Sequence, residues 1–162
     1  MSRELTGKVV GAYRLGEVAT WGKGPSATVY EAEHAASGNK VAVKVFHADF
    51  SKDKNVAARL VAEVQRATQA RHPHLAEVLD VGTTEHKGKR HVYIVTEWLK
   101  GDTLAARLAS RKEPLPLPLV LQIGADVGAA LQALHRSGAA HRTLSAAALF
   151  LAESADPADG EV

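Results

Sequence analysis

The sequence of 162 residues contains no cysteine and few aromatic residues, which make up 5% of the chain. Disulfide bonds, thiolate catalysis and cysteine-based zinc sites are therefore excluded, and the composition fits a reducing compartment. The hydrophobic fraction of 46% consequently rests on alanine, valine and leucine. A chain of this length can bury the core of one compact domain, or of two small lobes that share a cleft.

The sequence also lacks an excess of charge of one sign and a long hydrophobic run. Twenty basic residues face 18 acidic ones, for a net charge of +2, and the basic residues are scattered. Neither nucleic acid nor an anionic membrane is indicated as a partner. No window approaches the roughly 18 apolar residues of a membrane span, and the start has no apolar signal segment. We therefore expect a cytoplasmic protein without a membrane segment in this chain.

A series of strand-like segments is followed by helical ones. The runs ATVYEAEH and KVAVKVF are separated by the turn-forming AASGN, and AEVLDVG and HVYIVTEWL by the polar turn TTEHKGK. The predicted elements are strands in residues 13–46, a helix over 52–70, two further strands ending near residue 98, a short helix over 103–110 and a long helix over 119–136. This order predicts an α+β fold of two lobes with a hinge at 97–102.

Both longer helices carry an apolar stripe at helical spacing. On the first helix, Val56, Leu60, Glu63 and Ala67 share one face, and Ser51 is the predicted N-cap. On the second, the stripe consists of Val120, Ile123, Val127, Leu131 and Leu134. A carboxylate on an apolar face needs a partner, because burying an unpaired charge is costly. Lys44, on the preceding strand, is the expected partner of Glu63, although a structural salt bridge without any ligand would satisfy the same pattern.

Residues 22–29, GKGPSATV, match the pattern G-x-G-x-x-A-x-V. Two glycines let a backbone approach phosphate groups closely, with free N–H groups as donors. Because the segment opens a strand and not a helix, it indicates a hairpin flap over a nucleotide, with an ordinary Gly-Pro turn as the alternative. In VAVK, strand alternation places Ala42 and Lys44 on one face, which suits a flat ring beside phosphates. An exposed edge-strand lysine is the alternative.

Six features of the sequence occur in the order and spacing seen in serine/threonine protein kinases. They are the flap, the strand lysine, the helix glutamate, and the segments RHPHL, YIVTEWLKGDTL and HRTL. The opening GKVVGAYRLGEV resembles the bacterial branch of that family, and the resemblance covers the chain from about Lys8. It implies a kinase-like fold. Residues 1–98 would form an N-terminal lobe with a five-stranded antiparallel sheet and one long helix. Residues 99–162 would form the hinge and a truncated, mostly helical C-terminal lobe.

The resemblance also implies the residues of a nucleotide site. They are Gly22 and Gly24 in the flap, Val29 and Ala42 over the adenine, Lys44 on the α- and β-phosphates with Glu63 as its partner, Thr96 as gatekeeper, Glu97 and Leu99 in the hinge, Asp102 near the ribose and Phe150 on the pocket floor. Ala27 replaces the third flap glycine of the family.

The catalytic loop departs from the family pattern H-R-D-L-K-P-x-N. This chain has His141, Arg142, Thr143, Leu144, Ser145, Ala146, Ala147 and Ala148 there. Near pH 7, Thr143 cannot take the substrate proton as the family aspartate does. Ser145 has no positive charge for the transferring phosphate, and Ala148 has no oxygen for Mg²⁺. The sequence also ends at DGEV, where the family would begin the strand leading into D-F-G. No catalytic residue is expected to be intact, and no metal site is expected.

These features together predict a pseudokinase. We expect weak, Mg²⁺-independent binding of ATP or ADP and a role as scaffold or regulator of a protein partner, which would be another kinase, a substrate or a second copy. A structural interaction domain that binds no nucleotide and a fragment of a longer kinase-family protein are the alternatives. A hydrolase built on Ser145 and His141 lacks a nucleophile elbow. His72 and His74 lack the nearby carboxylates of a metal site.

Overall fold

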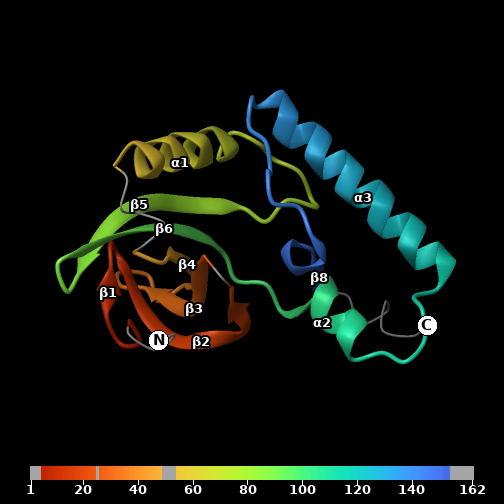
Figure 1. The fold of residues 1–162 in the computed structure, drawn as a ribbon, viewed down its shortest axis with the longest axis horizontal. Helices are drawn as coiled ribbons and strands as arrows, with labels where there is room; N and C mark the ends of the chain where they lie inside the picture. Colours follow the sequence, from red (N-terminus) through yellow and green to blue (C-terminus); the bar gives the residue numbers. More distant parts are fainter. Residues whose placement is uncertain (1–4, 25, 49–53, 154–162) are drawn as a thin grey trace.

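The computed structural model describes residues 5–24, 26–48 and 54–153. Within them, six strands form one antiparallel sheet that precedes a helical portion (Figure 1). The strands are β1 (Val9–Val10), β2 (Tyr13–Lys23), β3 (Ala27–His34), β4 (Lys40–Phe46), β5 (Val78–His86) and β6 (Lys89–Glu97), in the order β1-β2-β3-β4-β6-β5. The sequence predicted five of them. The sixth, β1, pairs with β2 across a turn in which Gly11 has a φ of 57°.

The turn between β5 and β6 is tighter than the predicted polar segment TTEHKGK. Only Lys87 and Gly88 connect the strands, and both have positive φ, at 50° and 71°. Two left-handed residues match the right-handed twist of the flanking strands, so pairing continues to His86 opposite Lys89. Most of the residues predicted as a turn therefore belong to strand β5.

Alternation along the strands separates two hydrophobic clusters. Tyr30, Val43 and Val95 lie in the cluster on one face of the sheet. Phe46 and Val92 lie in the other, which also contains Ala57 of α1 (Lys54–Ala67). Each fully buried valine contributes roughly 1.5–3 kcal/mol to the free energy of unfolding. Figure 1 shows α1 lying along β5 and β6, so the second cluster attaches this helix to the sheet.

The buried face of α1 is rotated from the predicted stripe. Val56 is 41% exposed, while Ala57 is buried and is packed with Leu60 and Val61. One residue corresponds to about 100° around a helix, so Val56 lies off the face centred on Ala57, whereas the other predicted members, Leu60, Glu63 and Ala67, are half-buried. The predicted cap Ser51 lies outside the described residues.

The helical portion consists of short elements around one long helix. They are β7 (Gly101–Thr103), α2 (Leu104–Ala109), α3 (Leu117–Arg136), the 3₁₀ turn Ala146–Ala148 and β8 (Phe150–Ala152), with β7 and β8 antiparallel. The Thr103 hydroxyl caps α2 by accepting the Ala106 N–H at 3.1 Å. α3 begins two residues before the predicted position, with Pro118 in its first turn, where no N–H bond is lost.

α3 is long and apolar, and most of its surface is uncovered. Only Ala130 and Leu134 of the helix are buried, and Leu117 is 68% exposed. By length and composition it is the one helix in the described part of the chain that is able to cross a membrane, with a mean hydropathy of 1.5. By length and composition, the expectation that no window approaches a membrane span is therefore not met, although no membrane span is shown. Length and composition do not distinguish such a span from an interior helix. Asp126 of α3 pairs with His74 at 3.3 Å, which joins the helix to the loop before β5.

Candidate nucleotide site

Four of the predicted site residues come together through the register of three strands. Val29 of β3 lies directly opposite Lys44 of β4, and Ala42 of β4 lies opposite Thr96 of β6. Directly opposed residues on antiparallel strands share a face, and Ala42 and Lys44 share theirs by alternation. Ala42 is buried, Val29 and Thr96 are half-buried, and Lys44 is exposed. These residues define what we call the cleft face of the sheet.

The two flap glycines have different structural requirements. A Cβ at Gly22 would collide with the Val29 carbonyl oxygen, so the hairpin itself requires glycine there. A Cβ at Gly24 would lie 3.3 Å from the Ala27 carbonyl oxygen, a tight but smaller conflict. The Gly24 N–H donates to that same carbonyl at 3.0 Å. Ala27, at the position of the third family glycine, is buried in the cluster with Phe46, so packing explains this departure.

The Lys44 ammonium lies over the ring of Phe46, 5.3 Å from its centroid. Surrounding protein atoms lower the pKa of Lys44 through desolvation. The side chain is nevertheless exposed, and hydration keeps its ammonium charged at neutral pH. Strand alternation places Phe46 two residues beyond Lys44 on the same face, and this is the sequence signal that identifies it as the neighbour of the lysine.

The expected contact between Lys44 and Glu63 is not present. Glu63 instead accepts a hydrogen bond from Nε of Arg142 at 2.6 Å, within an ion pair. The Glu63 side chain is 19% exposed, and that of Arg142 is 68% exposed. Among the described residues, no carboxylate lies within salt-bridge distance of Lys44. The need of Glu63 for a cation was correctly predicted, and the partner was not, because Arg142 lies 79 residues away in the chain.

The loop from His141 to Ala148 is built around backbone turns. The Thr143 N–H donates to the His141 carbonyl at 2.7 Å, and the Ala148 N–H to the Ser145 carbonyl at 2.9 Å. Arg142 has a φ of 60°, a left-handed conformation that is uncommon for a residue with a side chain. Thr143, Ser145 and Ala148 are all exposed. The loop therefore offers a hydroxyl or a methyl group at each of the three positions, and no charge.

His141 is the half-buried member of this loop. Its Nδ1 atom is buried and has no hydrogen-bond partner among the described residues. Burial lowers the pKa of His141, and the positive charge of Lys44 adds to this effect. The ring is therefore neutral at pH 7 and lies near enough to Lys44 to sense its charge.

The predicted hinge begins where β6 ends. The Glu97 N–H donates to the Glu77 carbonyl at 3.1 Å, and the Glu97 side chain accepts the Glu77 N–H at 2.8 Å. Glu97 lies opposite Val41, so its side chain belongs to the face away from Ala42 and Thr96. Neither of the two contacts with Glu77 uses the backbone carbonyl of Glu97. Leu99 is half-buried in the segment that follows.

Asp102 and Phe150 lie on the small β7–β8 ladder. Asp102 pairs with Leu151 and is exposed, while the half-buried Phe150 pairs with Thr103. Gly101, just before Asp102, has a φ of 130°, and a Cβ there would collide with the Leu151 carbonyl. Only glycine meets both conditions, so the ladder itself accounts for the glycine that ends the predicted hinge. In the described part of the chain, no group of three or more acidic or histidine side chains is arranged to hold a metal ion.

An antiparallel sheet with a packed helix, a lysine on the cleft face and an HR-containing loop beyond the sheet together define a protein of the kinase class. The sequence profile of the protein kinase domain matches residues 16–157, and the chain belongs to the protein kinase family.

Its relatives include a probable serine/threonine-protein kinase of Streptomyces coelicolor, 36% identical over 141 residues, an alignment covering 87% of this chain and 20% of the relative. PknA, a serine/threonine-protein kinase of Mycobacterium tuberculosis, is 35% identical over 144 residues, covering 88% of this chain and 32% of PknA. The crystal structure of the M. tuberculosis PknI kinase domain matches with a TM-score of 0.79 at 27% identity, over 91% of this chain and 57% of that one. The kinase-like fold is thereby confirmed, and the chain spans about a fifth to a third of these two curated relatives.

The pair between Glu63 and Arg142 leads to a prediction about stability. Arg142→Ala is expected to lower the free energy of unfolding by about 1 kcal/mol, because it leaves a mostly buried carboxylate without its charged donor. This expected loss of unfolding free energy is at the low end for breaking an ion pair, because Arg142 is largely exposed to water. Urea unfolding of the single variants and of the double variant with Glu63→Gln measures the coupling between the two residues. Arg136→Ala at the end of α3 is the control. A coupling energy near zero would contradict the assignment.

Proposed function

We propose that this domain binds ATP or ADP through the adenine side of the cleft, does not catalyse phosphoryl transfer, and acts as a scaffold or regulator of a protein partner. One observation carries the proposal. The strand register joins Val29, Ala42, Lys44 and Thr96 on one face, whereas the loop presents neither an acid, nor a cation, nor a metal ligand where the family has all three.

The residues on the cleft face fit an adenine nucleotide. Ala42 carries only a methyl group, which projects little from the sheet toward the position proposed for a flat ring. Gly22 and Gly24 place no side chain between the flap and the phosphates. Lys44 keeps its ammonium for an anion, because no described carboxylate neutralises it. Ala148 offers no oxygen to Mg²⁺, so binding in this proposal does not depend on the metal.

Binding is tested by the melting temperature of the protein in the presence of nucleotide. ATP at ten times its Kd is expected to raise stability by about 1.4 kcal/mol, or roughly 3 °C in Tm, with or without EDTA. Lys44→Ala is expected to weaken ATP severalfold and to leave adenosine binding unchanged, since only the phosphates contact the ammonium. Lys40→Ala, at the exposed start of the same strand, is the matched control. A shift that appears only with added Mg²⁺ would refute the metal-independent site.

A structural interaction domain without nucleotide is the second candidate. The pairing of Glu63 with Arg142 favours it, because it removes from Lys44 the carboxylate that was expected to position the lysine. Absence of any Tm shift at millimolar ATP, with and without EDTA, would select this candidate. This chain covers only 20% and 32% of the length of the two relatives, which is also compatible with its being part of a longer kinase-family protein.

A further inference from the structure

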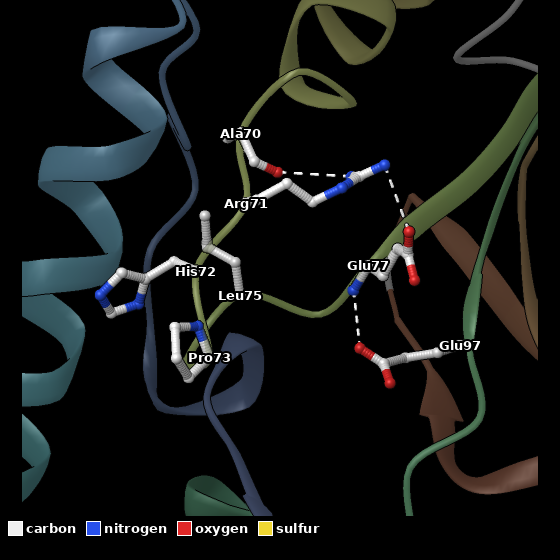
Figure 2. Close-up of a pocket in the computed structure, with 7 residues that line it drawn as sticks. All are labelled: Ala70, Arg71, His72, Pro73, Leu75, Glu77 and Glu97. Carbon is white, nitrogen blue, oxygen red and sulfur yellow. Dashed lines mark hydrogen bonds and ion pairs between the residues drawn. The ribbon is translucent and has the colours of Figure 1, made fainter.

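A cavity of about 620 Å³, widely open to solvent, lies apart from the cleft face, between the segment joining α1 to β5 and the end of β6 (Figure 2). Its lining includes the charged side chains of Arg71, Glu77 and Glu97 and the apolar side chains of Ala70, Pro73 and Leu75. The volume is within the range of cavities that bind small molecules or side chains. Of the predicted nucleotide-site residues, only Glu97 lines it, and the Glu97 side chain belongs to the face away from Ala42 and Thr96.

Two of the three charges in the cavity neutralise each other. Arg71 Nη2 lies 3.2 Å from Glu77 Oε1, and Arg71 Nη1 also donates to the Thr68 carbonyl at 2.9 Å. Figure 2 shows the Arg71 side chain extended toward Glu77 along one side of the cavity. The guanidinium of Arg71 is therefore already bonded to the Thr68 carbonyl and paired with Glu77.

Glu97 holds the remaining charge. Its Oε1 accepts the Glu77 N–H at 2.8 Å, and among the described residues it has no cationic partner. A half-buried carboxylate with one backbone donor keeps acceptor capacity for a cation, and such charge-assisted contacts are stronger than neutral ones. The cavity thus carries a net charge of −1 from these three side chains.

The imidazole of His72 does not pair with Glu97. Its Nδ1 accepts the His74 N–H at 3.2 Å, and no ion pair joins His72 to Glu97 in the described part of the chain. His74 has its own partner, Asp126 of α3. His72 therefore forms part of the wall of the cavity, and neither histidine of the RHPH segment pairs with Glu97.

We propose that this cavity is a docking site for an arginine side chain of a protein partner. The guanidinium would bind Glu97, and the aliphatic stem would lie against Pro73 and Leu75. Arginine combines an apolar stem with a planar, permanently charged donor group, which matches this mixed lining, and it is enriched among residues that dominate protein interfaces. A metal ion is disfavoured by the donor set, because Glu97 is the one carboxylate in the cavity without an internal cation.

The proposal is tested on the isotope-labelled chain without nucleotide, so the result does not depend on the proposed function. The probe is the capped peptide Gly-Ala-Arg-Ala-Gly, followed by amide chemical shifts. The Glu77 amide is the reporter, because it donates to Glu97. We expect saturable shifts at Glu77, Glu97 and the 70–75 segment. The same peptide with citrulline in place of arginine, which keeps the shape and removes the charge, is expected to bind at least about tenfold more weakly.

Glu97→Gln is the sharpest variant, because the amide oxygen still accepts the Glu77 N–H while the charge is lost. It is expected to reduce affinity for the arginine peptide at least about tenfold. Glu85→Gln, a 72%-exposed carboxylate near the other end of β5, is the matched control and should bind like the native chain. Shifts centred elsewhere, or equal affinities for the arginine and citrulline peptides, would overturn the proposal. If Glu97→Gln fails to fold, the peptide comparison on the native chain still decides.

Discussion

Incubation of this chain with ATP, Mg²⁺ or Mn²⁺ and a generic protein acceptor is expected to leave phosphoryl transfer at the background level. Loss of a general base alone typically costs about 10²–10⁴ in rate. Ser145 and Ala148 also remove a positive charge and a metal ligand that would stabilise the transferring phosphate. These losses are not additive, but together they leave little room for ordinary phosphoryl transfer.

The measurement is transfer of labelled γ-phosphate to the acceptor and to the chain itself. An active serine/threonine kinase in the same buffer is the positive control, and Lys44→Ala is the internal one. Transfer well above background that Lys44→Ala abolishes would show that the loop is catalytic despite its composition. The same assay applies to a longer form of the protein, because Thr143, Ser145 and Ala148 lie within this segment.

Replacement of Gly82 by alanine is expected to destabilise the sheet strongly. Gly82 of β5 lies opposite Tyr93 of β6, and an added Cβ would lie 2.6 Å from the tyrosine hydroxyl and 2.7 Å from Cζ. The tyrosine ring cannot move away from the added Cβ, because Tyr93 is buried and its hydroxyl already lies against Gly11. Overpacking of this kind costs about 1–3 kcal/mol, and we expect the upper end, or roughly a 5–10 °C fall in Tm.

Thermal unfolding followed by circular dichroism measures this effect. Gly124→Ala is the matched control: it lies within α3, and a Cβ there meets nothing within 4 Å. Alanine in a helix interior is favoured over glycine by about 1 kcal/mol, so this variant should be at least as stable as the native chain. If Gly82→Ala melts within about a degree of the native chain, the close packing of Tyr93 between two glycines is not a feature of the folded state.

The predictions from sequence were most accurate where a short repeat decides the outcome. Alternation in VAVK correctly separated Ala42 and Lys44 from the valines of the opposite face. The order of strands and helices followed from apolar periodicity and turn residues in the same way. The stripe on α1 was less accurate, since a shift of one residue rotates a helix face and the sequence alone contains few markers of that rotation. The roles of the nucleotide-site residues were predicted from resemblance and remain predictions.

What the sequence by itself determined is the chemistry available in the loop, because Thr143, Ser145 and Ala148 have the same functional groups in any fold. It also determined that Glu63 needs a cation, which follows from a charge on an apolar helix face. Only the tertiary structure decided that the cation is Arg142, that Lys44 lies on Phe46, and that Gly82 and Gly11 make room for Tyr93. These are contacts between segments far apart in the chain. Their distances depend on how the strands and α1 pack together, which local periodicity does not specify.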